Sequence, residues 1–181
     1  MRATRCRATS GMGGRIRPMT MKTLLLVRHA KSSRDDPTLL DRERPLNERG
    51  LHDAPAMGKR LAGRHAKPDL IISSPALRAL TTARLVANEI DYKHKDILVD
   101  ERLYSSSEET LLAVVHGLDE KLEHVMLFGH NPEFTDLAHR LSSEIVDMPT
   151  CAVAEFHYDT KSWRDVGEMA PSKARLDTPK K

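Results

Sequence analysis

The sequence predicts a single α/β domain with a mostly parallel central sheet and helices on both faces. Its 181 residues suffice for one domain. Apolar residues make up 39% of the chain and charged residues 30%, a balance typical of soluble globular proteins. Short apolar runs alternate with longer segments of helical period, and this alternation is typical of parallel sheets flanked by helices.

The first third of the domain contains one strand, one loop and one helix in this interpretation. Residues 23–28 form an apolar run that predicts a buried strand, and residues 30–45, rich in charge and proline, predict a long loop. Asn47 can cap a helix over 48–64, whose apolar residues share one face. Pro55 lies inside this segment and leaves room for a kink or a later start.

The remaining elements follow the same alternation. Residues 70–73 predict a strand and 76–89 a helix, with Pro75 near its first position. A weak strand over 96–99 precedes a helix that Ser106 or Ser107 can cap. The later elements are a helix over 108–118, a strand over 124–128, a short helix over 133–141 and an edge strand over 152–158.

The two ends differ in composition from the body, which we place at residues 21–169. Residues 1–20 hold five arginines and no acid, so we expect a disordered basic arm or an over-extended start, with a transit peptide as a third alternative. Residues 170–181 predict a short disordered basic tail. Residues 1–20 carry a charge of +5 and residues 170–181 a charge of +3. Because the whole chain has a net charge of +3, the body carries −5.

Several classes of protein fit this composition poorly. Aromatic residues make up 4% of the chain, too few for a surface that stacks nucleic-acid bases. The longest apolar run near the start, residues 24–27, is too short for a membrane span or a signal-peptide core. Cys6 and Cys151 have no companions at metal-ligand spacing, so we expect a reducing, cytoplasmic environment and no metal or other cofactor. The oligomeric state stays open, with a monomer as the simplest expectation.

Cationic and imidazole side chains follow three of the predicted strands. Arg28 and His29 end the first strand, Arg78 lies one turn into the helix after the second, and His130 follows the strand over 124–128. Because the carboxyl ends of parallel strands meet at one edge of a sheet, these residues are expected to converge there.

This set of side chains suits phosphoryl transfer. Two arginines match the oxygens of a phosphoryl dianion, and helix N-termini add backbone donors. A neutral imidazole among cations keeps a lone pair that can attack phosphorus. The second histidine, if protonated, could stabilise charge on the transferring oxygens, so that no metal is required.

The same residues resemble the signature blocks of a known family. Residues 25–30 (LLVRHA), 73–83 (SSPALRALTTA) and 129–132 (GHNP) resemble, in order, three blocks of the histidine phosphatase (phosphoglycerate mutase-like) superfamily. Residues 44–50 (RPLNERG) and the small size resemble its compact bacterial SixA-type phosphohistidine phosphatases. The likeness covers about residues 21–160.

The resemblance implies a role for each matching residue. His29 would be the phosphorylated nucleophile, Arg28 and Arg78 would bind the phosphoryl group, and His130 would stabilise the transition state. Arg44 would be a further phosphate or substrate contact from the long loop. One departure is Ala30, where many members have glycine.

A general acid for the leaving group is not assigned by the sequence. The candidates are Glu101, Glu108, Glu109 and Asp41. The SixA-type subgroup lacks an obvious one, which suits a phosphoramidate, because an imidazole leaving group can be protonated on its own ring.

The sequence thus predicts a metal-independent phosphatase that removes a phosphoryl group from a histidine of a partner protein. The small size leaves little chain for a lid, and an open pocket suits a phosphorylated side chain. The alternatives are a phosphatase of small phosphate monoesters and a phosphate-binding module with little turnover. A mutase and a nucleic-acid-binding protein that uses its basic ends fit less well.

Overall fold

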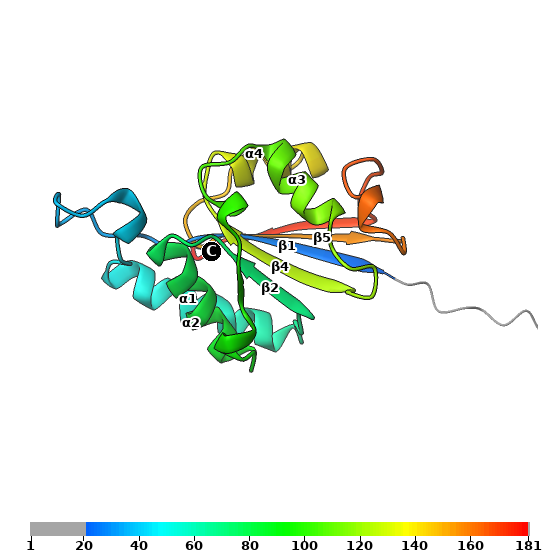
Figure 1. The fold of residues 1–181 in the computed structure, drawn as a ribbon. Helices are drawn as coiled ribbons and strands as arrows, with labels where there is room; N and C mark the ends of the chain where they lie inside the picture. Colours follow the sequence, from blue (N-terminus) through cyan, green and yellow to red (C-terminus); the bar gives the residue numbers. More distant parts are fainter. Residues whose placement is uncertain (1–20, 181) are drawn as a thin grey trace, which may run out of the picture.

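The computed structural model describes residues 21–180 and consists of one six-stranded sheet with two helical layers (Figure 1). The expectation for residues 1–20 lies outside the described residues. The strands are β1 (Lys22–Arg28), β2 (Leu70–Ser73), β3 (Leu98–Val99), β4 (His124–Gly129), β5 (Val153–Tyr158) and β6 (Lys173–Asp177). The helices are α1 (Glu48–Gly63), α2 (Leu77–Glu89), α3 (Glu108–His116) and α4 (Glu133–Leu141), with 3-10 turns at Asp41–Glu43, His94–Asp96, Glu101–Leu103 and Trp163–Asp165.

The sheet has the strand order β3-β2-β4-β1-β5-β6. Strands β1 to β4 are parallel, whereas β5 runs antiparallel to both β1 and β6. The α/β architecture with a mostly parallel sheet is confirmed. Because β1, β2 and β4 are parallel neighbours, their carboxyl ends lie at one edge of the sheet, as the site prediction requires.

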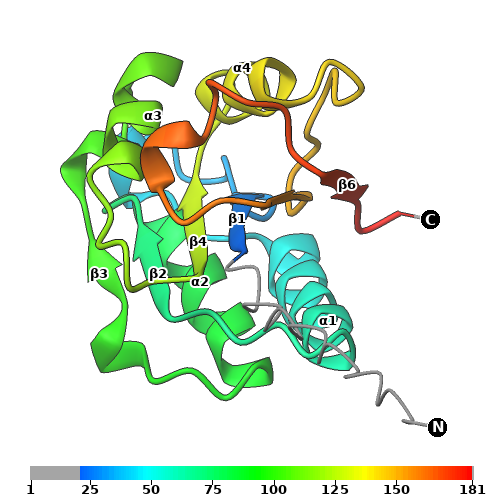
Figure 2. The ribbon, with the colours of Figure 1, turned by 90° about the vertical axis from the view of Figure 1, so that its right-hand side faces the viewer.

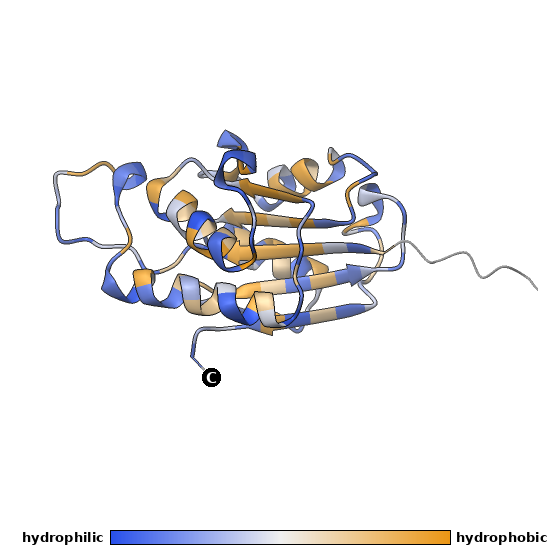
Figure 3. Cartoon of the chain, turned by 90° about the horizontal axis from the view of Figure 1, so that it is seen from below, coloured by the Kyte–Doolittle hydropathy of each residue, from blue (hydrophilic) through white to orange (hydrophobic). Residues whose placement is uncertain are grey.

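The core consists of two layers, one on each face of the sheet. Along β1, Leu24 and Leu26 pack in the layer that includes α3 and α4, while Leu25 and Val27 pack in the layer with α1 and α2. This alternation follows from the two-residue period of a strand. Figure 3 shows apolar colour along the inner strands and mixed colour on the helices, as expected for helices that bury one face.

The helix starts agree closely with the sequence analysis. The side chain of Asn47 accepts a hydrogen bond from the backbone N–H of Gly50, and Ser107 does the same for Thr110. Helix α1 begins at Glu48 and continues through Pro55, so the later start is wrong. Pro55 is the eighth residue of α1, so it lies in the helix interior and removes one N–H from the helical hydrogen bonds.

The expected disordered tail is wrong for residues 173–177. Residues Lys173–Asp177 form β6, which pairs along β5 at the edge of the sheet (Figure 2). Strand β5 is therefore not an edge strand. The carboxylate of Asp177 is buried and accepts hydrogen bonds from Arg60 of α1 and from Arg64, which follows α1 directly. The composition of this segment does not predict a strand, because the strand is stabilised by pairing with β5 and by an ion pair with a helix that is distant in sequence.

No helix within residues 21–180 combines the length and the apolar character that crossing a membrane would require.

Candidate active site

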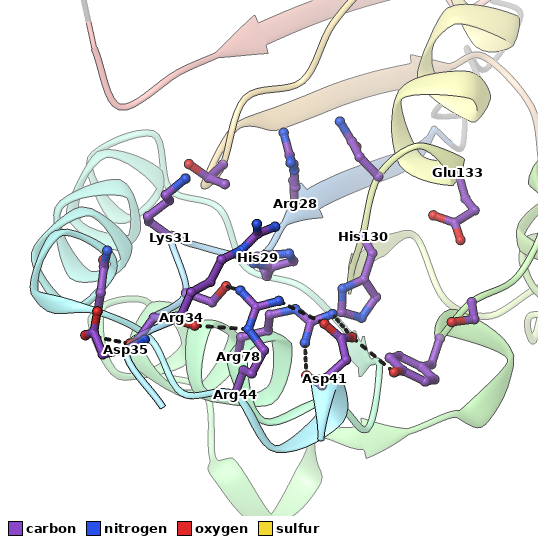
Figure 4. A pocket seen from close by; sticks show the side chains of 17 residues that line it. Arg28, His29, Lys31, Arg34, Asp35, Asp41, Arg44, Arg78, His130 and Glu133 are labelled. Carbon is purple, nitrogen blue, oxygen red and sulfur yellow. Dashed lines mark hydrogen bonds and ion pairs between the residues drawn. The ribbon is translucent and has the colours of Figure 1, made fainter. Parts of the chain in front are cut away.

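A cavity of about 550 Å³ opens at the carboxyl ends of β1, β2 and β4. All five residues that the sequence singled out for the site line it: Arg28, His29, Arg44, Arg78 and His130. Figure 4 shows the ring of His29 with the side chains of Arg44, Arg78, Asp41 and His130 around it. The predicted convergence at one sheet edge is therefore present in the structure.

The ring of His29 has a defined orientation. Its Nδ1 atom lies 2.7 Å from the backbone carbonyl oxygen of Ala30. Because a carbonyl oxygen only accepts, Nδ1 carries the proton in this hydrogen bond, and Nε2 of the neutral ring keeps its lone pair. The backbone N–H of Ala30 donates to the hydroxyl of Thr82 on α2, which anchors the segment after β1.

The surroundings of His29 favour the neutral imidazole. Burial is the largest cause that lowers the pKa of His29, and the hydrogen bond to Ala30 opposes it. The positive charges of Arg78, Arg28 and Arg44 lower it further, to about 4. The residue pattern alone predicts that the cations cause this effect, whereas in the structure burial contributes more.

His130 lies beside His29, with 5.1 Å between the ring centroids. Burial lowers the pKa of His130 to about 3. Repulsion between the two rings if His29 is also protonated and the charge of Arg78 lower the pKa further, and the charge of Asp41 opposes them. The neutral form of His130 is thus favoured at neutral pH, rather than the protonated form that the sequence analysis considered. Its Nε2 atom lies 2.7 Å from the hydroxyl oxygen of Ser74.

The arginines differ in how much of their hydrogen-bonding capacity the protein uses. Arg28 donates from Nη1 to the carbonyl oxygen of Met148, while its buried Nε has no partner among the described residues. Arg44 donates from Nε, Nη1 and Nη2 to Ser33, Asp41 and Ser32. Arg44 therefore holds the loop together, whereas Arg28 keeps donors for a ligand.

Of the four acids that the sequence offers as general-acid candidates, Asp41 lines the cavity. Its carboxylate accepts hydrogen bonds from Arg78, Arg44 and Tyr104. Burial works against ionisation, but these hydrogen bonds prevail and lower the pKa of Asp41 to about 2. Asp41 is therefore ionised at neutral pH and is a poor proton donor.

The other three candidate acids do not line the cavity. Glu101 pairs with Arg42, Glu108 lies beside Arg140, and Glu109 is exposed. Glu133, which the sequence analysis did not consider, does line it, and its buried Oε2 has no partner among the described residues. Glu133 is the first residue of α4, shortly after the end of β4. This position beyond a strand end is the sequence feature that could have identified it as a site residue.

Tyr104 and Ser74 also belong to this site without a role assigned from sequence. Tyr104 lines the cavity and packs edge-on against His130, with 5.5 Å between ring centroids. It follows the short strand β3, so it too lies beyond a strand end. Within residues 21–180, no group of three histidine, cysteine or acidic side chains is arranged to hold a metal ion. Independence from a metal stays a prediction.

The fold and this cavity define a class of protein with a buried, neutral histidine among arginines at the carboxyl edge of an α/β sheet. The sequence profile of the histidine phosphatase superfamily (branch 1) matches residues 24–122. This chain belongs to that superfamily.

Comparisons with individual proteins agree with this membership. An uncharacterized chloroplastic protein of Arabidopsis thaliana is 28% identical over 152 residues, which cover 80% of this chain and 70% of that protein. The Agrobacterium tumefaciens protein assigned as the phosphohistidine phosphatase SixA is similar in structure, with a TM-score of 0.70 and 28% identity over 76% of this chain and 92% of that one. A protein histidine phosphatase SixA in complex with tungstate gives a TM-score of 0.70 at 22% identity, over 86% and 94%.

Proposed function

We propose that this protein is a phosphohistidine phosphatase that removes a phosphoryl group from a histidine of another protein through a phosphorylated His29. The observation that carries the proposal is the state of the His29 ring. Nδ1 donates to the carbonyl oxygen of Ala30, so the lone pair of Nε2 is available beside the guanidinium groups of Arg28 and Arg78. A neutral imidazole among fixed cations is suited to attack a phosphoryl dianion.

The proposed reaction has two steps. Nε2 of His29 forms a bond to phosphorus, and the P–N bond of the substrate breaks with its electron pair returning to the substrate imidazole. That imidazole leaves neutral when its other nitrogen carries a proton. Water then bonds to phosphorus, and the P–N bond electrons return to Nε2 of His29. The products are the enzyme with a neutral His29 imidazole and inorganic phosphate, which carries both protons of the water.

The state of Asp41 supports a phosphoramidate substrate. Asp41 has a pKa of about 2 and pairs with Arg78, so it offers no proton to a leaving group at neutral pH. An imidazole leaving group needs little help of this kind, whereas an alkoxide needs much more. The similarity to the Agrobacterium SixA protein, at 28% identity, points to the same substrate class.

A phosphatase of small phosphate monoesters is the second candidate, and Glu133 is the observation that favours it. This carboxyl group lines the cavity, and its buried Oε2 has no partner among the described residues. It could therefore donate a proton to an ester oxygen. If so, Glu133→Gln lowers turnover of monoesters while turnover of a phosphohistidine protein changes little.

The central experiment is to trap the phosphorylated enzyme. The full chain is incubated with a radiolabelled phosphohistidine protein and quenched in base, and the acid-labile label is mapped to a residue. We expect label on His29, none on the variant His29→Ala, and unchanged labelling of His52→Ala, whose side chain is 82% exposed. Activity that survives in His29→Ala would contradict the proposal. Tungstate binding without any turnover would favour a phosphate-binding module.

A further inference from the structure

Ser74 is a buried polar residue in contact with His130 of the candidate site, with no role in the reaction described above. It follows β2, and its backbone N–H donates to the carbonyl oxygen of Phe128 in the neighbouring strand β4. This bond holds Ser74 beside the end of β4, where His130 begins the next segment. The side chain of Ser74 is inaccessible to solvent, and its Oγ lies 2.7 Å from Nε2 of His130.

The direction of this hydrogen bond follows from counting donors and acceptors. A serine hydroxyl has one proton to donate and lone pairs that accept. One lone pair of Ser74 Oγ accepts a hydrogen bond from the backbone N–H of Ala76, which leaves the hydroxyl proton to be placed. Within residues 21–180, Nε2 of His130 is the acceptor available to the hydroxyl proton. Because a buried hydroxyl without an acceptor is costly, the proton points to Nε2.

The other ring nitrogen of His130 then determines what the ring can offer a ligand. Nδ1 is buried and has no partner among the described residues. If Nε2 accepts from Ser74, the neutral ring carries its proton on Nδ1 and this atom is a donor. In the opposite tautomer, with the proton on Nε2, the Nδ1 atom would carry a lone pair and the hydroxyl of Ser74 would have no acceptor for its proton. The ring lines the cavity 5.1 Å from that of His29, where a donor suits phosphoryl oxygens and a lone pair repels them.

We propose that Ser74 is a positioning residue that donates to Nε2 of His130 and thereby holds the neutral imidazole in the Nδ1–H tautomer, ready to donate to the phosphoryl group. Two neutral histidines then have opposite functions in one site. His29 presents a lone pair because a carbonyl oxygen holds its proton, and His130 presents a proton because a hydroxyl occupies its lone pair. The low pKa of His130 agrees with a neutral ring. This inference rests on the proposed function for its catalytic meaning.

The tautomer can be measured without substrate. Two-bond ¹H–¹⁵N correlation spectra of the full chain with labelled histidine, recorded near pH 7.5, distinguish the protonated nitrogen of each ring. We expect His130 in the Nδ1–H form in the wild-type protein, and a mixture of tautomers in Ser74→Ala. The matched control is Ser73→Ala, because Ser73 is equally buried but its hydroxyl donates to the carbonyl oxygen of Ser74 rather than to His130.

Binding and turnover provide the second measurement. Ser74→Ala should weaken tungstate binding and lower kcat by about tenfold each, since one donor to the anion is lost part of the time. Ser74→Thr, which keeps the hydroxyl, should restore the wild-type tautomer and most of the activity, and Ser73→Ala should change neither quantity. A wild-type His130 in the Nε2–H form overturns the proposal, as does an unchanged tautomer in Ser74→Ala. Because the spectra need no phosphorylated enzyme, a missing label on His29 would contradict the proposed function alone.

Discussion

The carboxylate of Asp41 lies 2.8 Å from Nη2 of Arg78, and the backbone carbonyl oxygen of Asp41 accepts from Nη1 of the same guanidinium. A residue of the long loop thus occupies one edge of an arginine that is expected to bind the phosphoryl group. The carboxylate is half-exposed at the cavity, and it brings a negative charge to the place where an anion is to bind.

Replacing Asp41 by asparagine is therefore expected to strengthen anion binding. The amide oxygen still accepts a hydrogen bond from Arg78, but the repulsion between the carboxylate and a bound oxyanion is lost. We expect tungstate to bind about 3- to 10-fold more tightly at low ionic strength, with a smaller gain in high salt. Isothermal titration calorimetry measures both values.

The matched control for this change is Asp35→Asn. Asp35 also lines the cavity, but its carboxylate accepts from Ser33 rather than from Arg78. Its gain in affinity should be smaller. Weaker tungstate binding by Asp41→Asn would instead show that the charge of Asp41 is needed to orient Arg78.

Gly50 allows helix α1 to approach the segment that follows His29. A Cβ atom at this position would overlap the backbone carbonyl oxygen of Lys31, so a side chain forces either α1 or that segment to move. We expect Gly50→Ala to lower kcat/KM by roughly 10- to 100-fold, because small displacements of a nucleophile are costly.

Gly63 provides the comparison at the other end of the same helix. A Cβ atom there meets nothing within 4 Å, so Gly63→Ala should keep full activity. It should also raise the free energy of unfolding, by at most about 1 kcal/mol, because alanine favours the helix. Equal activity of the two variants would contradict the proposed role of the close approach.

The buried histidines predict a loss of stability in mild acid. His29 has a folded pKa of about 4 and a reference value of 6.5. Above pH 6.5 the ring is neutral in both states, so pH has no effect through this group. As pH falls from 6.5 towards 4, the unfolded chain binds a proton that the folded chain does not. The free energy of unfolding then falls by about 1.4 kcal/mol per pH unit for each such histidine.

The measurement is urea unfolding of wild type and His29→Asn between pH 6.5 and 4.5. The variant lacks one of the histidines that bind a proton on unfolding. Its free energy of unfolding should therefore depend less steeply on pH, with a slope that corresponds to roughly one proton fewer bound on unfolding. His130, with a pKa of about 3, retains its own contribution in both proteins. Identical slopes would show that His29 is not held neutral.

Strand β6 is expected to contribute to stability through Asp177. This side chain is 6% exposed and pairs with Arg60 at 2.7 Å and Arg64 at 3.0 Å, which joins the sheet edge to α1. Asp177→Asn should lower the free energy of unfolding by about 1–3 kcal/mol, since two cations lose a charged partner. Chemical unfolding compares it with Glu168→Gln at an exposed position, where little change is expected.

The elements and the central site residues could be predicted because they depend on local signals. The continuous apolar run of β1 and the caps Asn47 and Ser107 act within a few residues of themselves. Residues beyond the ends of parallel strands must share one edge, so Arg28, His29 and His130 converge wherever the sheet forms.

Other features depend on partners far away in the chain, and only the tertiary structure decides them. The pairing of Asp41 with Arg78 spans 37 residues, and the hydrogen bond of Ser74 with His130 spans 56. Strand β6 forms because β5 pairs with its backbone and Arg60 and Arg64 pair with its Asp177, although its own residues resemble a basic tail. Periodicity and composition report on neighbours in sequence. Which carboxylate meets which arginine, and which nitrogen of a buried histidine keeps its proton, are determined by groups that only folding brings together.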